Sequence, residues 1–209
     1  MKPDRLAASA GFSLIELLAV IAIIGVLAAL LVPAVGTIQT RARQSQSRAL
    51  FTQLATACVH YKADFGYYPL FGQAKGTTDT VIRFEEAAGD VYRTLTGFDP
   101  LTGESILGGS RRSLNAKGRS YFSFSESDLQ GEYVVDAFGN RDIVLVVDSD
   151  YNNQLQSAVI NGAEPATHID GLPEDAFQPE LTENLRQPVA LFSAGAGAGR
   201  EVTTWVVRD

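Results

Sequence analysis

The first 65 residues are dominated by a long apolar block that later turns amphipathic. From Leu17 to Val32 no residue is charged or strongly polar, and the wider stretch 12–35 is interrupted only by Ser13, Glu16 and Pro33. A helix rises about 1.5 Å per residue, so this stretch would be about 36 Å long, more than the roughly 30 Å hydrocarbon core of a bilayer. The pattern predicts a transmembrane helix over residues 12–35.

The helical period continues beyond Pro33, but the segment 36–65 has one apolar and one polar side. Its apolar positions recur mostly three or four residues apart: Ile38, Ala42, Ala49, Leu50, Leu54, Ala57, Cys58, Tyr61 and Phe65. A glycine and the sequence "YYP" follow, as expected where a helix ends. We predict one helix from about Ser13 to Asp64, bent at Pro33 because proline removes a backbone donor.

The remaining residues, 66–209, show shorter and more mixed patterns that predict an α+β head. Residues 84–97 have one apolar side and predict a short helix, whereas 99–119 and the proline-containing 163–188 predict loops. Short apolar runs predict strands at 121–124, 132–135, 142–147, 158–160, 189–192 and 202–207. Such strands suggest a small antiparallel sheet, which can build a core only if the amphipathic half of the helix packs on it.

Charge and cysteine content exclude some classes of function. The chain has 24 acidic and 17 basic residues, a net charge of −7, and no cluster of lysine and arginine. Nucleic-acid binding is therefore not expected, because phosphate contacts supply most of that affinity. The single cysteine, Cys58, cannot form an intramolecular disulfide. Its helical spacing from Leu54 and Tyr61 predicts a small core residue.

Two general explanations of the apolar block are open. A secretory signal peptide would explain the block and the weak cleavage sequence "PAVG" at 33–36, but the block exceeds the usual 7–15 residues and contains Glu16. A plain signal anchor would explain its length, although basic residues flank the block on both sides and do not fix its orientation. Neither explanation accounts for a charged carboxylate at Glu16 inside the apolar block.

The sequence "GFSLIELLAVIAIIGVLAALLVP" resembles the N-terminus of the type IV pilin and type II secretion pseudopilin superfamily. The shared features are Gly11, Phe12, a carboxylate at Glu16, a glycine at Gly25 and a proline at Pro33. The resemblance implies that residues 1–11 are a leader, cut between Gly11 and Phe12 by a prepilin peptidase that also methylates the Phe12 amine. It also implies that 12–35 is both membrane span and filament core, and that 66–209 is a periplasmic head.

The resemblance to this superfamily suggests a role for the Glu16 carboxylate in filament assembly. A charge buried in lipid is costly unless it is paired, and cleavage creates a positive amine at Phe12. We hypothesise that Glu16 of one subunit neutralises the Phe12 amine of a neighbour and so sets the axial register of a filament. Small residues on this helix would let neighbours approach closely: Ala19, Ala22, Gly25, Ala28 and Ala29. Gly25 and Pro33 also weaken the helix, so a kink or local melting is expected between them.

Two later segments resemble the major, G-type pseudopilins. One is "DAFGNRDIVLVVDSD" (136–150), and the other is "PVALFSAGAGAGREVTTW" (188–205), in which Ser193, Gly195, Thr204 and Trp205 match. Type IV pilins usually close their C-terminal region with a disulfide, which one cysteine cannot supply. The resemblance therefore implies a homopolymeric type II secretion pseudopilin in the bacterial inner membrane, crossing it once with a cytoplasmic N-terminus. Minor pseudopilins, an inner-membrane platform protein and an assembly ATPase are the implied partners. A type IV pilin for adhesion or motility is the alternative.

Calcium is the cofactor that the resemblance raises. Major pseudopilins typically bind it through aspartates after the Ser-x-Gly segment, but residues 196–199 here are alanine and glycine, with Glu201 the only nearby carboxylate. Another candidate is "DSDYNNQ" (148–154), which begins like a calcium loop with Asp148, Asp150 and Asn152 at alternating positions. This loop lacks the later glycine and acidic residue of an EF-hand, and aspartate-rich turns often form without a metal.

No motif predicts an enzyme. The glycines after "VALFS" do not have dinucleotide-binding spacing, and Ser193 lacks the first glycine of a nucleophile elbow. The histidines, His60 and His168, lie in the amphipathic helix and in the predicted loop 163–188, with no matching nucleophile. A signal-anchored periplasmic hydrolase is the alternative from a different class, and it would never polymerise.

Overall fold

The computed structural model describes residues 13–75, 78–163, 181–195, 197 and 202–205, without the side chains of 30–35 and 112. The chain divides into two compact units, one ending at Arg41 and one beginning at Ala42. Helix α1 (Leu14–Phe65) contributes to both units.

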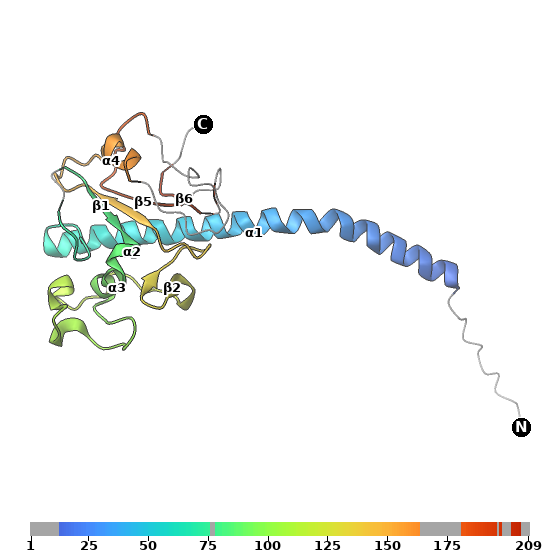
Figure 1. The fold of residues 1–209 in the computed structure, drawn as a ribbon, viewed down its shortest axis with the longest axis horizontal. Coiled ribbons are helices and arrows are strands. Elements are labelled where there is room, and N and C mark those ends of the chain that lie inside the picture. Colours follow the sequence, from blue (N-terminus) through green and yellow to red (C-terminus); the bar gives the residue numbers. More distant parts are fainter. Residues whose placement is uncertain (1–12, 76–77, 164–180, 196, 198–201, 206–209) are drawn as a thin grey trace, which may run out of the picture. The chain divides into compact units, whose positions relative to one another are not determined.

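Helix α1 is the longest element and confirms the predicted single helix to within a residue at each end (Figure 1). It remains helical through Pro33, and the predicted bend or melting at Gly25 and Pro33 stays a prediction. None of the helices in the described part of the chain has the length and apolarity together that a bilayer crossing requires.

The head contains a four-stranded antiparallel sheet, which confirms the predicted α+β class. Its strands, in spatial order, are β1 (Thr80–Arg83), β4 (Val144–Val147), β5 (Val189–Ser193) and β6 (Val202–Thr203). Strand β4 is central, because Thr80 pairs with Val147 on one side and Val189 pairs with the same residue on the other. A separate hairpin joins β2 (Leu129–Gln130) to β3 (Tyr133–Val134).

Short helices fill the connections between these strands. They are α2 (Phe84–Ala87), α3 (Gly89–Thr96), α4 (Ser157–Asn161) and the 3-10 helices Ile106–Gly108, Arg112–Asn115 and Glu126–Asp128. The predicted helix 84–97 is thus two helices, separated at Ala88, whose φ of 42° is incompatible with a continuous helix. The predicted loop 99–119 contains two of the 3-10 helices, and most of the predicted loop 163–188 lies outside the described residues.

Two predicted strands are wrong. Residues 158–160 belong to α4, because a short apolar run does not distinguish a buried helix turn from a strand. Residues 121–124 form no strand: the backbone N–H groups of Tyr121 and Phe122 both donate to the Leu95 carbonyl, so α3 holds this segment. Strands β1 and β2 were not predicted. Each is short, and each is extended because it forms backbone hydrogen bonds with a neighbouring strand, β4 for β1 and β3 for β2. The predicted strand 202–207 is described only as far as β6 and residue 205.

The amphipathic half of α1 packs on one face of the sheet, as predicted (Figure 1). This core contains, among others, Leu50, Phe51, Leu54 and Cys58 from α1, and Ile82, Leu145, Val147 and Leu191 from the sheet. Burial raises the pKa of the Cys58 thiol to about 12, so it stays neutral and serves as a core residue.

A second core lies on the opposite face of β4 and β5, where Val144, Val146, Ala190 and Phe192 meet Leu155 and Ile160. Trp205 joins this core, with its ring edge-on to Phe192 at 5.6 Å between centroids. Because both faces of β4 and β5 are covered, these strands have continuous apolar sequences rather than alternating ones.

Candidate functional site

The predicted assembly residue Glu16 lies in the first turn of α1, and the predicted processing residues Gly11 and Phe12 precede this helix in the sequence. Gly11 and Phe12 lie outside the described residues, whereas Glu16 is described. Its Oε2 accepts a hydrogen bond from the backbone N–H of Ser13 at 2.9 Å, and the Ser13 carbonyl accepts from the N–H of Leu17. This is the backbone half of a capping box, in which a glutamate in the first turn satisfies a free helix donor. The spacing Ser-x-x-Glu was the sequence signal for this contact, and sequence reasoning missed it.

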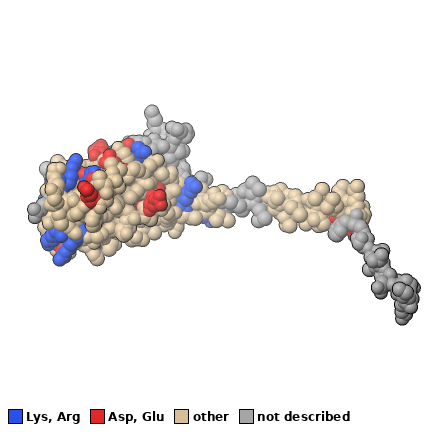
Figure 2. Space-filling model, turned by 90° about the horizontal axis from the view of Figure 1, so that it is seen from below, with Lys and Arg blue, Asp and Glu red and all other residues tan. Residues whose placement is uncertain are grey.

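Large apolar side chains surround Glu16 and are exposed in the first unit. They are Leu14, Ile15, Leu17, Leu18, Val20, Ile21, Ile23, Ile24, Val26 and Leu27, and Leu14 is 80% exposed. Figure 2 shows that lysine, arginine, aspartate and glutamate gather on the head, while the described surface of this segment is almost free of them. A continuous apolar surface of this size marks a membrane or protein contact.

Gly25 lies within this apolar segment. A Cβ atom placed on it would meet nothing within 4 Å, so the fold of a single chain does not require glycine at this position. Glycine costs about 1 kcal/mol relative to alanine inside a helix. The reason for this glycine must therefore be sought outside the isolated chain, for example in close approach of another helix.

In the head, the two segments that resemble pseudopilins meet at the buried Asp136. Its Oδ1 accepts from the backbone N–H groups of Phe138 and Asn140, both at 2.9 Å. Its Oδ2 accepts from the Asn140 side chain at 2.8 Å and from the Ser193 hydroxyl at 2.7 Å. Burial raises the pKa of the Asp136 carboxyl, and these hydrogen bonds act in the opposite direction.

Further bonds extend this contact to the C-terminal loop and to α1. The Asn140 side chain also donates to the Gly195 carbonyl at 2.8 Å, and the Ala137 N–H donates to the hydroxyl of Ser47 on α1 at 2.9 Å. Thr204 pairs with the backbone of Leu191 through both its N–H and its hydroxyl oxygen. The residues that match pseudopilins therefore have a structural role: they connect the segment 136–140 to the end of β5, and Thr204 to Leu191 in β5. The Ser193 hydroxyl has a structural partner in Asp136 rather than a catalytic one.

The loop after β4 has the compact form of an aspartate turn. The oxygens of Asp148 accept from the N–H groups of Asn152 (3.2 Å) and Asn153 (2.7 Å). The side-chain oxygen of Asn152 accepts from the N–H of Gln154 at 2.7 Å, and its amide donates to Asp150 at 2.9 Å. Asn152 thus shapes the loop, and the metal predicted at Asp148, Asp150 and Asn152 stays a prediction.

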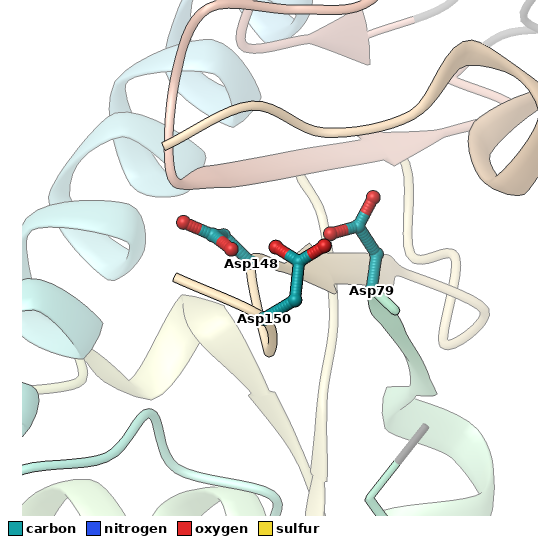
Figure 3. A group of neighbouring side chains, drawn as sticks. All are labelled: Asp79, Asp148 and Asp150. Carbon is teal, nitrogen blue, oxygen red and sulfur yellow. The ribbon is translucent and has the colours of Figure 1, made fainter. Parts of the chain in front are cut away.

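A third carboxylate, which the sequence did not indicate, lies beside this loop. Asp79 directly precedes β1, and the pairing of Thr80 with Val147 places it next to the residues that follow β4. One oxygen from each of Asp79, Asp148 and Asp150 lies within 4.8 Å of the other two. Figure 3 shows the three side chains close together, with Asp150 between Asp148 and Asp79. No sequence spacing links positions so far apart, so only the strand pairing reveals the group.

Other predicted residues are not brought together. Most of the segment where pseudopilins usually bind calcium lies outside the described residues, as does His168. His60 lies exposed on α1. The described residues therefore leave the usual calcium position untested.

Comparison with known families matches residues 6–32 to the prokaryotic N-terminal methylation motif. No curated protein and no solved structure matches the chain. This motif is typical of type IV pilins and pseudopilins, and it implies a membrane-anchored prepilin. Pilin-like proteins are in general processed by prepilin peptidase and polymerise. Proteins of this kind are generally not enzymes. The chain therefore carries the prepilin methylation motif of type IV pilin-like proteins, at the start of a long helix that packs on an antiparallel sheet.

Proposed function

We propose that this protein is the major pseudopilin of a type II secretion system. Subunits would wait in the bacterial inner membrane with the head in the periplasm, and would then join a short filament that pushes folded proteins outward. Minor pseudopilins, an inner-membrane platform protein and an assembly ATPase would be the partners. Prepilin peptidase would cut between Gly11 and Phe12.

The observation that carries the proposal is the methylation motif together with the exposed apolar helix surface that lies within it. The motif covers 6–32, and the exposed side chains from Leu14 to Leu27 belong to the same segment. A subunit can cover this surface with lipid before assembly and with neighbouring helices afterwards. A head-to-tail contact that does not close on itself then generates a filament.

Two features favour a pseudopilin over a type IV pilin. Cys58 is buried and unpaired, so the head has no C-terminal disulfide. Asp136, Ser193 and Gly195, which match pseudopilin positions, are joined through hydrogen bonds that hold the end of β5 and the residues directly after it without a covalent bond. A type IV pilin for adhesion or motility is the second candidate, and it predicts long filaments outside the cell rather than short periplasmic ones.

The mature N-terminus tests the proposal directly. Intact-mass spectrometry of the protein from its native membrane should give a chain that begins at Phe12 and carries one methyl group. A chain that still contains Met1–Gly11 would exclude processing by prepilin peptidase. Cleavage after the "PAVG" segment would instead identify a signal peptide.

Replacing Gly25 with alanine should separate folding from assembly. The new methyl group meets nothing within 4 Å, so the unassembled chain should keep its fold, with its helix stabilised by up to about 1 kcal/mol. Filament yield, counted by electron microscopy after overexpression, should nevertheless fall because neighbouring helices would be held apart. Ala22→Gly is the matched control for helix propensity. It exchanges the same two residue types in the opposite direction, about one helical turn earlier. Undiminished yield in Gly25→Ala would contradict close packing at this glycine.

A further inference from the structure

The carboxylates of Asp79, Asp148 and Asp150 converge from two places in the chain. Asp79 precedes β1, and the other two follow β4. One oxygen of each lies within 4.8 Å of the others, and Figure 3 shows the Asp150 carboxylate between those of Asp148 and Asp79. Asp79 and Asp148 are buried, with 6% and 1% of their surfaces exposed, whereas Asp150 is open to solvent.

The second observation is a buried oxygen without a partner. The Oδ2 of Asp79 accepts from the backbone N–H of Gln156 at 2.6 Å, but its Oδ1 is buried and accepts no hydrogen bond from any residue that the structure describes. An unsatisfied buried polar atom is costly, by about 1–3 kcal/mol and by more when it is charged. An oxygen in this state, on a side chain beside two other carboxylates, is suited to bind a cation.

Among the described residues, no basic side chain neutralises these three carboxylates through an ion pair. No lysine, arginine or histidine among them forms an ion pair with any of the three aspartates. Lys62 and Lys75 lie over the ring of Tyr151 instead. Burial raises the pKa of the Asp79 carboxyl, and the charges of Asp150 and Asp148 add to the increase. Three carboxylates this close repel one another unless a cation or protons intervene.

We propose that Asp79, Asp148 and Asp150 bind one Ca²⁺ ion. Calcium is held by oxygen ligands at about 2.3–2.6 Å, so two ligands on opposite sides of the ion lie up to about 5 Å apart. The three oxygens lie no more than 4.8 Å apart, which fits within this limit. Calcium accepts flexible coordination by several carboxylate oxygens, whereas Mg²⁺ requires near-ideal octahedral geometry and keeps several of its waters. Asp150 forms the solvent side of the site, through which the ion enters and where water completes its coordination.

The remaining hydrogen bonds of the group are compatible with this role. The Asp148 oxygens each accept one backbone N–H, and a carboxylate oxygen has a second lone pair for a metal. Asp79 also holds the N–H of Gln156, the residue immediately before α4. The ion would therefore fasten the start of β1, the end of β4 and the entry to α4. Its binding should stabilise the head.

Metal binding to the full-length chain in detergent micelles tests this site. After EGTA treatment and its removal, Ca²⁺ titration by calorimetry should show one site, and Ca²⁺ should raise the melting temperature. Tb³⁺ should bind in its place and emit when tyrosine is excited, because Tyr151 follows Asp150 directly. Asp79→Asn and Asp150→Asn should each weaken Ca²⁺ binding at least tenfold. Asp128→Asn removes the same charge from an exposed turn in another part of the head and should leave the affinity unchanged.

Stability in EGTA distinguishes a ligand from a merely structural aspartate. Without metal, Asp79→Asn should melt at or above the wild-type temperature, because it removes a buried charge from a repelling group. The exposed Asp150→Asn repeats the affinity test where misfolding is not expected. The proposal fails if neither Ca²⁺ nor Tb³⁺ binds saturably at millimolar concentration, or if Asp150→Asn binds as tightly as Asp128→Asn. It also fails if Mg²⁺ binds as tightly as Ca²⁺.

Discussion

Replacing Glu16 with leucine is expected to abolish filament assembly while the head stays folded. In the assembled state the Phe12 amine of each neighbour would be left without a counter-charge in an apolar core. Removing one partner of a buried ion pair costs about 3–5 kcal/mol, which corresponds to a loss of about 100-fold or more in the assembly constant. Filament yield by electron microscopy and the head's melting temperature are the two measurements.

The structure makes a sharper control available for this experiment. Glu16 also accepts the N–H of Ser13 within its own chain, so leucine would remove both a charge and a helix cap. Glutamine keeps an oxygen acceptor at the same position in the first turn but carries no charge. If the charge pairs between subunits, Glu16→Gln should assemble as poorly as Glu16→Leu. Wild-type assembly by Glu16→Gln would show that capping is sufficient, and the register hypothesis would be wrong.

Replacing Asp136 with alanine should have the largest effect on the stability of the head. The change leaves the backbone N–H groups of Phe138 and Asn140 and the Asn140 side chain without their acceptor. It also breaks the link to Ser193, and all of these groups lie in a buried or half-buried setting. We expect a loss of about 3–5 kcal/mol, a large part of the 5–15 kcal/mol that typically stabilises a domain.

Urea unfolding of the full-length chain in micelles can measure this loss. Fluorescence reports it well, because Trp205 is the only tryptophan and lies in the second core. The matched control is Asp128→Ala, whose carboxylate accepts from the N–H and hydroxyl of Ser125 in an exposed turn, and which should cost about 1 kcal/mol. If the two variants lost similar stability, the Asp136 contacts would not be central to the head.

The long helix could be predicted from the sequence because its determinants are local. The apolar run, the later three-to-four spacing and the glycine after Phe65 each act within a few turns, and α1 spans Leu14–Phe65 as expected. Strands β4 and β5 were predictable for a similar reason, since their continuous apolar residues are buried on both faces. The segment 158–160 was not, because an apolar triplet adopts whichever structure its surroundings stabilise.

The sequence by itself determined the processing motif, the helix and the antiparallel α+β class, since periodic patterns and a short motif encode them locally. Only the tertiary structure decided that Asp136 joins Asn140 to Ser193, and that Asp79 faces Asp148 and Asp150. These contacts depend on strand pairings between residues far apart in the chain. The register of β1 against β4, with Thr80 opposite Val147, brings the three carboxylates together. A shift of one residue would turn Asp79 to the other face of the sheet.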